Sequence, residues 1–462
     1  MNSATAIVLA AGLGKRLKSN LPKALHRANG RPLLHYVLKA IREVDGVGGV
    51  IVVVGKGKDE VIDYVNQHFE GVTFVDQPQQ LGTGDAVKRT QQELSDHEGT
   101  ILVLPGDGPL IKAATIERLL HEHEKTQADI TLLTANLDNP RGYGRIVRSD
   151  GDFDRIVEEA DAGPGEQAIN EVSSGVFCFR AQRLFAALDK VTTDNAQGEY
   201  YLPDAALVIR AEGGKMYTVM ADDGNEIRGV NDRSELADVS RQLRLEYLEK
   251  LASNGVTIED PLTTYIDEGV EVGPDTVIRP LTFIEGSSRI GSGCQIGPST
   301  RIADSIVDDG AEVTFSVVRE SHIGAEATVG PFASLRPGTR LGPRAKAGTF
   351  VEIKGSIIGE GSKVPHQSYV GDAEIGKDVN LGAGTITGNY DNETKVKSKT
   401  VIEDGAFTGS NTTLVAPVTV AKDAGTGAGS VVTKDVEPED IVAGVPARKM
   451  RKRKPRPRDN KK

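Results

Sequence analysis

The feature that most constrains this chain is a six-residue repeat between Val272 and Val432, in which an aliphatic residue is followed by a small one. A six-residue period matches neither an α-helix nor a strand of an open sheet, and it is typical of parallel β-helices. Three hexads are expected to close one triangular coil, with aliphatic side chains stacked inside and Gly, Pro or Asp at the corners. The clearest steps are Ile290-Gly291, Ile296-Gly297, Ile323-Gly324, Val329-Gly330, Leu341-Gly342, Ile375-Gly376 and Leu381-Gly382.

The first half of the chain has a different pattern. Strand-like runs at 6–9, 49–54, 100–104 and 130–134 alternate with helical patterns at 32–41, 85–94 and 115–120. This alternation predicts a doubly wound, largely parallel α/β sheet of the Rossmann-like kind, with ligands at the carboxyl ends of its strands. The predicted organisation is therefore an α/β domain at 1–230, a linker helix at 231–253, a left-handed parallel β-helix at 254–446 and a disordered basic tail at 447–462.

Composition narrows the function classes. The formal net charge of -11 argues against a general nucleic-acid binder, which would present a basic surface. Only two cysteines occur, Cys178 and Cys294, which suits a reduced, cytoplasmic protein and excludes a disulfide framework. No apolar run is long enough for membrane insertion, and the apolar start leads straight into Gly12-Leu13-Gly14, which favours a strand and loop over a signal peptide.

A glycine loop follows the first predicted strand, in the segment from Leu9 to Arg16. Such a loop lets backbone amides approach a phosphate chain, and Arg16 and Lys23 would neutralise charge during phosphoryl transfer. The spacing is that of neither a dinucleotide fingerprint nor a Walker A loop. On this segment alone, a tight turn with solvated Arg and Lys side chains is an equally good interpretation.

Three further segments favour a nucleotide site. Residues 77–84 precede a helix and offer amides and a hydroxyl suited to the edge of a base. Asp107 follows the strand at 101–104, where a carboxylate can hold a magnesium ion, and Asn231 could supply a second oxygen ligand. The alternative is that Asp107 only caps a turn.

Together with Gly142 to Ile146 and Asn195 to Tyr201, these segments resemble the sugar nucleotidyltransferases. The chain is most similar to the family of bifunctional N-acetylglucosamine-1-phosphate uridylyltransferase/glucosamine-1-phosphate acetyltransferases of bacterial cell-wall precursor synthesis, over nearly its whole length. The resemblance implies acetyl transfer from acetyl-CoA to glucosamine 1-phosphate. It further implies uridylyl transfer from UTP to N-acetylglucosamine 1-phosphate, with Mg²⁺ as cofactor and release of pyrophosphate.

The resemblance also implies roles for single residues of the first domain. Arg16 and Lys23 would be the catalytic cations on the phosphates, and Asp107 with Asn231 would bind the metal. Phosphoryl transfer needs positioning, cations and a metal rather than a nucleophilic side chain. Besides Lys23 and Asn231, the nucleotide and its sugar would contact Leu9, Ala10, Ala11, Gly12, Gln77, Gly82, Thr83, Gly144, Glu158 and Ser173.

Two positions depart from the family pattern. The family usually has threonine where Lys15 stands and a sugar-binding asparagine where Ser173 stands. A hydroxyl is shorter than a carboxamide and cannot span the same hydrogen bonds. We therefore expect these positions to affect sugar affinity and not the reaction class.

The repeat region carries a second set of polar residues, at intervals that successive coils could bring to one edge. Acetyl transfer to an amine needs a base, and His366 is suited to that role, while Arg336, Lys354 and Lys395 could bind a sugar phosphate. The alternative is that His366 is an ordinary polar surface residue.

By the resemblance, His366 is the general base, oriented by Glu352, and glucosamine 1-phosphate is bound by Arg336, Lys354, Tyr369 and Asn380. The acetyl-CoA site would be completed by neighbouring subunits of a homotrimer. An arginine that some relatives place near Gly444 is absent, so we expect Arg448 or Lys449 to replace it. The acetyl-CoA site itself would include Ala383, Asn389, Tyr390, Ser410 and Ala428.

Two alternatives belong to other classes. In one, the chain is a single-activity nucleotidyltransferase for another sugar nucleotide, and the β-helix is only an oligomerisation scaffold. In the other, the β-helix holds a metal as β-helical carbonic anhydrases do, which requires three histidines, whereas the repeat region has only His322 and His366. The basic tail is interpreted as a solvated end, with an anionic partner as the alternative.

Overall fold

The computed structural model describes residues 4–454, which form two compact units. The division falls between Leu243 and Arg244, inside helix α8 (Arg233–Ser253). Each unit has its own core: the first part of α8 contributes Val239 and Leu243 to the N-terminal unit, and the second part contributes Leu248 and Leu251 to the C-terminal unit. No helix within the described residues is long and apolar enough to cross a membrane.

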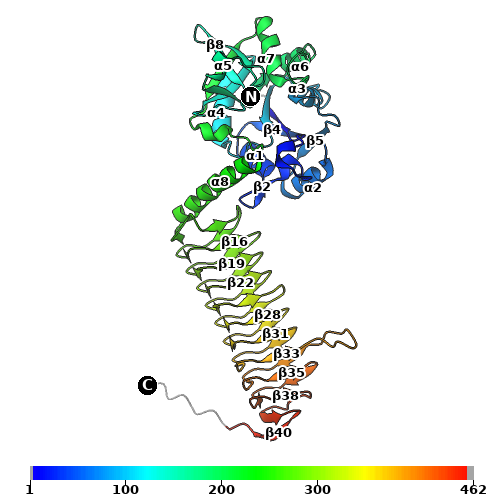
Figure 1. The fold of residues 1–462 in the computed structure, drawn as a ribbon, viewed down its shortest axis with the longest axis vertical. Helices are drawn as coiled ribbons and strands as arrows, with labels where there is room; N and C mark the ends of the chain where they lie inside the picture. The colour runs from blue at the N-terminus through cyan, green and yellow to red at the C-terminus, as the bar shows by residue number, and fades with distance from the viewer. Residues whose placement is uncertain (1–3, 455–462) are drawn as a thin grey trace. The chain divides into compact units, whose positions relative to one another are not determined.

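A central sheet organises the N-terminal unit (Figure 1). Its strands follow the order β11-β7-β10-β6-β1-β4-β5. Most neighbours are parallel, as predicted, but β10 runs antiparallel to both β6 and β7. The sheet is therefore mixed. The hairpin of β8 (Arg145–Ser149) and β9 (Asp152–Val157) branches from β10. The main strands are β1 (Ala4–Leu9), β4 (Val47–Val54), β5 (Val72–Asp76), β6 (Thr100–Pro105), β7 (Ile130–Asn136), β10 (Glu171–Arg180) and β11 (Met216–Met220).

Helices cover both faces of this sheet because the buried strands present apolar side chains on both sides. One core contains Leu34, Val37 and Leu119 from α1 and α4, and the other contains Val87 and Leu184 from α3 and α6. The helices are α1 (Leu33–Arg42), α2 (Lys58–His68), α3 (Thr83–Lys88), α4 (Ala113–Thr126), α5 (Pro164–Gln167), α6 (Ala181–Leu188) and α7 (Leu202–Ala211).

Helix α3 is shorter than the helix predicted at 85–94. It ends at Lys88, and the Thr90 hydroxyl donates a hydrogen bond of 2.7 Å to the carbonyl of Val87. A threonine hydroxyl that bonds nearby backbone in this way competes with helical hydrogen bonding. The segment after Lys88 therefore continues as turns.

The C-terminal unit is the parallel β-helix predicted by the repeat, seen as a ladder in Figure 1. Its first sheet contains β12 (Thr257–Ile258), β15 (Val277–Ile278), β18 (Gln295–Ile296), β21 (Glu312–Val313), β24 (Thr328–Val329), β27 (Lys346–Thr349) and β30 (Lys363–His366). Its second sheet contains β13 (Tyr265–Ile266), β16 (Phe283–Glu285), β19 (Arg301–Ala303), β22 (Val317–Arg319), β25 (Ser334–Leu335), β28 (Glu352–Lys354), β31 (Tyr369–Gly371), β33 (Ile386–Gly388), β35 (Thr413–Val415) and β38 (Val431–Val432). Its third sheet contains β14 (Glu271–Val272), β17 (Arg289–Ile290), β20 (Ile306–Val307), β23 (His322–Ile323), β26 (Arg340–Leu341), β29 (Ile357–Ile358), β32 (Ala373–Ile375), β34 (Thr400–Ile402) and β36 (Val418–Val420).

The register follows from the hexads. Ile278 pairs with Ile296, three hexads further along, and both side chains are fully buried in one continuous core. Burying an isoleucine side chain contributes about 1.5–3 kcal/mol to the free energy of folding. Each coil buries aliphatic side chains in this way, so the contribution recurs along the β-helix. Corners need the left-handed backbone region, and at Gly330 (φ 108°) an added Cβ would lie 2.1 Å from the Thr314 carbonyl oxygen. Glycine at that step is therefore a steric requirement.

One loop departs from the simple ladder. Residues 389–399 leave the coil between β33 and β34 and form a projecting loop, closed by an antiparallel bridge between Tyr390 and Lys397 (Figure 1). After this loop the strands return to their ladders, with Thr387 beside Leu414.

The prediction of disorder from residue 447 is wrong for the start of the tail. Strand β40 (Ala447–Lys452) pairs antiparallel with β39 (Asp440–Gly444). The buried carboxylate of Asp440 forms ion pairs with Lys449 at 2.7 Å and Lys452 at 2.8 Å, which fixes the basic strand to the ladder. The rest of the predicted tail, at 455–462, lies outside the described residues.

Candidate functional sites

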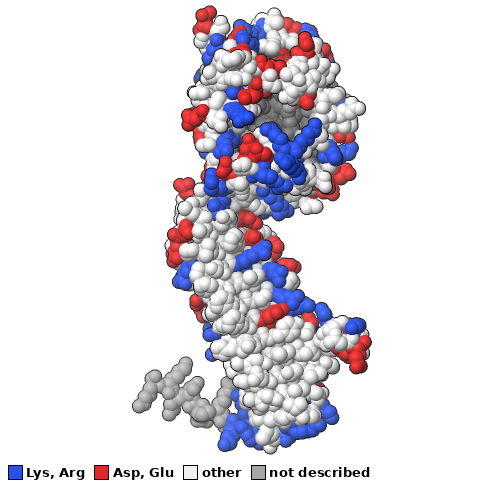
Figure 2. Space-filling view, viewed as in Figure 1, with Lys and Arg blue, Asp and Glu red and all other residues white. Residues whose placement is uncertain are grey.

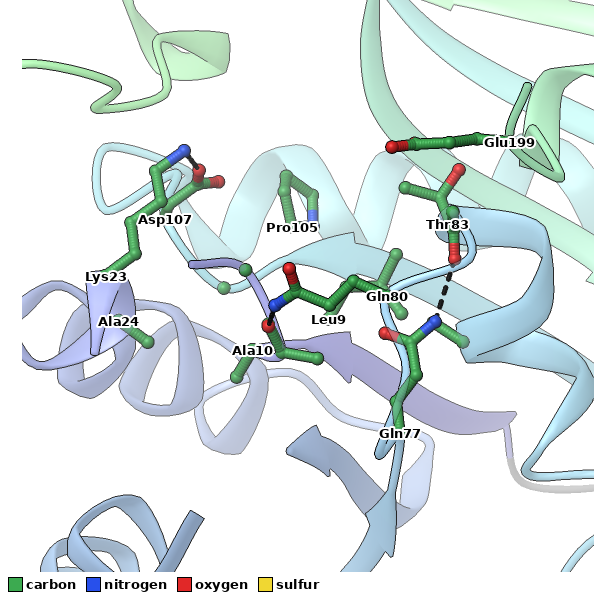
Figure 3. A pocket seen from close by; sticks show the side chains of 15 residues that line it. Leu9, Ala10, Lys23, Ala24, Gln77, Gln80, Thr83, Pro105, Asp107 and Glu199 are labelled. Carbon is green, nitrogen blue, oxygen red and sulfur yellow. Dashed lines mark hydrogen bonds and ion pairs between the residues drawn. The ribbon is translucent and has the colours of Figure 1, made fainter. Parts of the chain in front are cut away.

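A pocket of about 370 Å³ opens at the carboxyl ends of β1 and β6 in the N-terminal unit. It has one charged end at Lys23 and Asp107, and at the other end the amide of Gln77 and the hydroxyl of Thr83 lie beside the carboxylate of Glu199 (Figure 3). Figure 2 shows a hollow on this unit with basic side chains gathered along one side. The sequence-predicted residues that line the pocket are Leu9, Ala10, Ala11, Gly12, Lys23, Gln77, Gly82, Thr83 and Asp107.

Sequence reasoning missed several lining residues. Gln80 lies inside the segment interpreted as base-binding, and its amide donates a hydrogen bond to the Ala11 carbonyl. Glu199 lies inside the motif at 195–201 that supported the family resemblance. Because Gln80 and Glu199 lie inside these two segments, the sequence could have identified both as candidate site residues. The remaining missed residues are Ala24, Ala86, Pro105 and Gly106.

At the charged end, three residues far apart in sequence meet. The Lys23 ammonium forms an ion pair with Asp107 and donates a 2.9 Å hydrogen bond to Oδ1 of Asn231. The Asp107 carbonyl in turn accepts a 3.0 Å hydrogen bond from the amide of Val230, which holds the two segments together. Arg16 lies in the short helix η1 (Lys15–Leu17), is exposed, and is not part of the pocket lining.

At the other end, Gln77 is buried, and its side-chain nitrogen donates to the Gly82 carbonyl at 3.0 Å and to Asp85 at 2.8 Å. Gly82 has a φ of 112°, and a Cβ added there would lie 2.4 Å from the carbonyl oxygen of Tyr200. The loop can take this path only with glycine at that position.

Of the residues predicted to contact the sugar, Thr83 lines the pocket, whereas Gly144 and Glu158, together with Ser173, form a group outside the pocket lining. The amide of Ser173 donates a 2.8 Å hydrogen bond to the carbonyl of Gly144. A Cβ on Gly144 would lie 3.2 Å from Oε1 of Glu158, so the carboxylate passes close to the backbone there. Burial, and then the nearby carboxylates of Asp204 and Asp161, raise the pKa of Glu158.

In the C-terminal unit, strand register brings predicted residues of neighbouring coils together. Ser334 pairs with Glu352, and Glu352 pairs with Tyr369. The guanidinium of Arg336 donates a 2.7 Å hydrogen bond to the Glu352 carboxylate. These residues therefore lie on one face of adjacent coils.

Lys354 has a lysine of the projecting loop as a neighbour. The neighbouring ammonium of Lys397, and more weakly burial and Arg336, lower the pKa of Lys354. Lys397 pairs across the loop with Tyr390, and Lys395, the lysine predicted to bind the sugar phosphate, lies two residues earlier in the same loop. The spacing of lysines in this segment did not distinguish the two.

His366 is exposed at the end of β30. Among the described residues, no hydrogen bond or ion pair joins its side chain to Glu352, whose carboxylate binds Arg336 instead. The single chain therefore does not contain the predicted contact that would orient the histidine. Asn380 lies one coil further on, bridged to Lys363 and Phe407.

The predicted acetyl-CoA residues fall on successive coils. The amide of Asn411 donates to the Ala383 carbonyl at 2.6 Å, and that of Gly429 donates to the Ser410 carbonyl at 2.8 Å. Ala383, Ser410 and Ala428 thus follow one line along the ladder. Asn389 is buried and donates a 2.5 Å hydrogen bond to Asp372, whereas Tyr390 is exposed on the projecting loop.

Of the two predicted replacements for the missing arginine, Lys449 is paired with Asp440. Arg448 lies opposite Ala443 across the β39–β40 pair. Ala443 packs against Gly427, where an added Cβ would lie 2.8 Å from the Ala443 Cβ. Both residues lie on the strand beside the coil of Gly427 and Ala428, because the amide of Gly427 donates to the carbonyl of Val442, which is opposite Lys449.

A doubly wound α/β unit with a pocket at its strand ends, followed by a hexapeptide β-helix, defines the class of sugar nucleotidyltransferases joined to a β-helical acyltransferase. A family model described as the MobA-like NTP transferase domain matches residues 6–201. The whole chain can be placed more closely. It belongs to the family of the bifunctional protein GlmU, as predicted from the sequence.

Three relatives carry this assignment, and each is named bifunctional protein GlmU. The relative from Syntrophomonas wolfei is 46% identical and is covered over 96% of its length by 95% of this chain. Those from Heliobacterium modesticaldum and Carboxydothermus hydrogenoformans are 49% and 47% identical, over 94% and 96% of this chain and 94% and 98% of their own. A solved putative glucose-1-phosphate thymidylyltransferase from Bacillus anthracis aligns with 52% of this chain and 96% of its own at 16% identity, with a TM-score of 0.44.

Proposed function

We propose that this chain makes UDP-N-acetylglucosamine in two steps, each at its own site. The β-helix transfers an acetyl group from acetyl-CoA to glucosamine 1-phosphate, and the α/β unit then transfers a uridylyl group from UTP to N-acetylglucosamine 1-phosphate with release of pyrophosphate. The observation that carries this proposal is the meeting of Lys23, Asp107 and Asn231 at the charged end of the pocket. The alternative of a single-activity enzyme with a scaffold β-helix has no support from the relatives, which are bifunctional.

In the α/β unit, one end of the pocket would bind the base and the other end would stabilise the charge on the phosphates. The amide end receives the base, and Lys23, joined by the exposed Arg16, neutralises charge on the phosphates. In-line displacement then requires only that the sugar phosphate be held against the α-phosphate. Gly144, Glu158 and Ser173 are the residues we propose to hold the sugar.

The charged end fits Mg²⁺. Asp107 and Asn231 direct two oxygen atoms to one point, where the ammonium of Lys23 lies. Among the described residues no group of three His, Cys, Asp or Glu side chains could hold a metal, so this ion would take its other ligands from phosphates and water, as Mg²⁺ usually does. When bound, the ion supplies electrostatic stabilisation of the transferring phosphoryl group.

In the β-helix, we propose that His366 takes the proton from the amine of glucosamine 1-phosphate as the acetyl group is transferred. Arg336 and Lys354 bind the sugar phosphate, and Lys397 adds a third cation. Tyr369 and Asn380 would contact the sugar, and Glu352 would orient the base once its contact with Arg336 is rearranged. Acetyl-CoA would bind along Ala383, Ser410 and Ala428, flanked by Asn389 and Tyr390. Because Lys449 is paired with Asp440, we propose Arg448 as the phosphate partner of coenzyme A.

We further propose that the chain forms a homotrimer. Phe315, Phe332 and Phe350 form a row along one corner of the β-helix, with ring centroids 5.8 Å and 5.4 Å apart, and all three are exposed in the single chain. A continuous exposed apolar row of this kind marks a protein interface. Neighbouring copies would also supply the groups that His366 lacks in the single chain. Both cysteines are unpaired, which supports a cytoplasmic location.

A paired assay tests the proposal. The purified protein is expected to release pyrophosphate from UTP with N-acetylglucosamine 1-phosphate and Mg²⁺, and free coenzyme A from acetyl-CoA with glucosamine 1-phosphate. His366→Ala is expected to abolish only the second reaction, and Asp107→Ala only the first. Loss of both activities from either substitution in a folded protein would contradict two independent sites.

A further inference from the structure

The pocket of the α/β unit admits a nucleoside triphosphate in only one direction. Lys23 and Asp107 lie at one end, Gln77 and Thr83 lie at the other beside Glu199, and the amide of Gln80 lies between the two ends (Figure 3). Phosphates are attracted to the cation at Lys23 and repelled by the carboxylate of Glu199, so the neutral base is expected at the end with Gln77. The base is therefore read by the side chains at that end, and Gln77 is the most buried of them, at 4% exposed.

The polarity of the Gln77 amide is determined by its partners. Nε2 donates to the carbonyl oxygen of Gly82 at 3.0 Å and to Oδ2 of Asp85 at 2.8 Å. Both partners can only accept a hydrogen bond, so the group that faces them must be the NH₂ group. Figure 3 shows this nitrogen directed to the loop at Gly82 and Thr83, with the amide oxygen directed away from that bond. The group that Gln77 has left for a ligand is an acceptor.

Asp85 is itself held in place from outside the pocket. Its Oδ2 accepts a 3.0 Å hydrogen bond from Nε of Arg89, one turn later, and neither residue lines the pocket. The carboxylate thus joins the arginine to the buried glutamine. A charged acceptor binds the NH₂ group more strongly than the Gly82 carbonyl does alone.

We infer that Asp85 is a positioning residue that sets the base selectivity of the uridylyl site. By holding the Gln77 nitrogen, it presents the amide oxygen to the base, where N3–H of uracil can donate to it. Cytosine carries a lone pair at N3, so two acceptors would face each other and both would lose a partner. Thymine has the same N3–H as uracil and is not distinguished in this way. The inference rests on the proposed function, in which UTP is the substrate.

Ratios of kcat/KM measured within one preparation test this inference, because the concentration of active enzyme cancels. The uridylyltransferase reaction is followed with UTP, CTP and dTTP for the wild-type protein, Asp85→Ala and Arg89→Gln. Arg89→Gln is the matched control, since it removes the same ion pair but leaves the carboxylate on Gln77. Asp85→Leu, of similar shape, replaces Asp85→Ala if the alanine variant does not fold.

For Asp85→Ala we expect the UTP/CTP ratio to fall about tenfold, the size of one lost hydrogen bond to a charged group. The UTP/dTTP ratio should stay within about twofold of wild type, and Arg89→Gln should retain both ratios. An unchanged UTP/CTP ratio in Asp85→Ala, or an equal fall in Arg89→Gln, would overturn the inference. A wild-type protein that does not turn over UTP would instead refute the proposed function, and one that uses UTP and CTP equally would refute the inference alone.

Discussion

Single residues decide the shape of both candidate sites. Gly82 lets the loop pass within contact of Tyr200, and Lys23 joins Asp107 to Asn231 across distant segments. In the β-helix, Arg336 donates a hydrogen bond to the carboxylate of Glu352, which was predicted to orient His366. The identity of such residues can be predicted from a motif, but their partners depend on which side chains the fold brings within hydrogen-bonding distance.

Gly82→Ala tests the steric argument at the residue scale. An added Cβ would lie 2.4 Å from the Tyr200 carbonyl oxygen in a backbone conformation with φ of 112°, so the loop must move and carry Gln77 with it. We expect kcat/KM for uridylyl transfer to fall about a hundredfold, as misplacement by about 1 Å commonly causes. Acetyl transfer in the same preparation should be unchanged.

Gly142→Ala is the control for this substitution. Gly142 also has a positive φ, of 87°, but an added Cβ would meet nothing within 4 Å. It should therefore cost only the local backbone strain, about 1 kcal/mol by thermal unfolding. Equal loss of activity in the two variants would show that backbone strain, and not contact with Tyr200, is the cause.

At the scale of elements, repeats were predicted far better than their interruptions. The hexads predicted the coils because one period serves many steps, and Ile278 and Ile296 occupy the core as expected. Strand β10 was not expected to be antiparallel, since its direction depends on the path of the chain through β8 and β9. Strand β40 was predicted to be disordered because it is rich in basic residues. The buried Asp440 neutralises two of them, and the sequence alone does not show that Asp440 lies beside them.

The attachment of β40 should depend on pH. The ammonium groups of Lys449 and Lys452 hold the pKa of Asp440 below its usual value. The ion pairs therefore stabilise the fold fully above the unfolded aspartate value of about 3.9, and this contribution is lost as pH falls through the lower folded value. Asp440→Asn should lower the Tm at pH 7, and the difference from wild type should vanish in acid.

Glu437→Gln provides a comparison at the same end of the ladder, because Glu437 is exposed. Its Tm should match that of the wild-type protein at both pH values. A Tm difference for Asp440→Asn that stays constant into acid would show that the carboxylate charge is not what holds β40. At pH 7, limited proteolysis after residue 447 should be faster in Asp440→Asn than in the wild-type protein, and equally slow in Glu437→Gln.

For the whole molecule, the two units have separate cores and are proposed to differ in their need for oligomerisation. The pocket residues of the α/β unit all belong to one unit of one chain. The proposed acetyltransfer site shares the β-helix with the exposed phenylalanine row. Assembly should therefore matter to acetyl transfer and not to uridylyl transfer.

Phe332→Asp tests this difference. Phe332 is the middle ring of the row and is 55% exposed, so a carboxylate there should leave the single chain folded and disrupt the proposed trimer. Light scattering should report monomers, with acetyl transfer lost and uridylyl transfer retained. Tyr217→Asp, at a comparably exposed aromatic of the N-terminal unit, should leave mass and both activities unchanged. A trimeric Phe332→Asp protein would refute the assignment of this row.

The loop at 389–399 leaves the ladder and rejoins it without disturbing the coils on either side, since Thr387 still lies beside Leu414. Lengthening such a loop costs little, about 0.6 kcal/mol for each doubling. The β-helix can thus accept insertions of many sizes here while its core stays the same. This loop carries Tyr390 and Lys397, which we propose to contact the substrates of acetyl transfer, so changes in its length could alter those contacts and leave the coils unchanged.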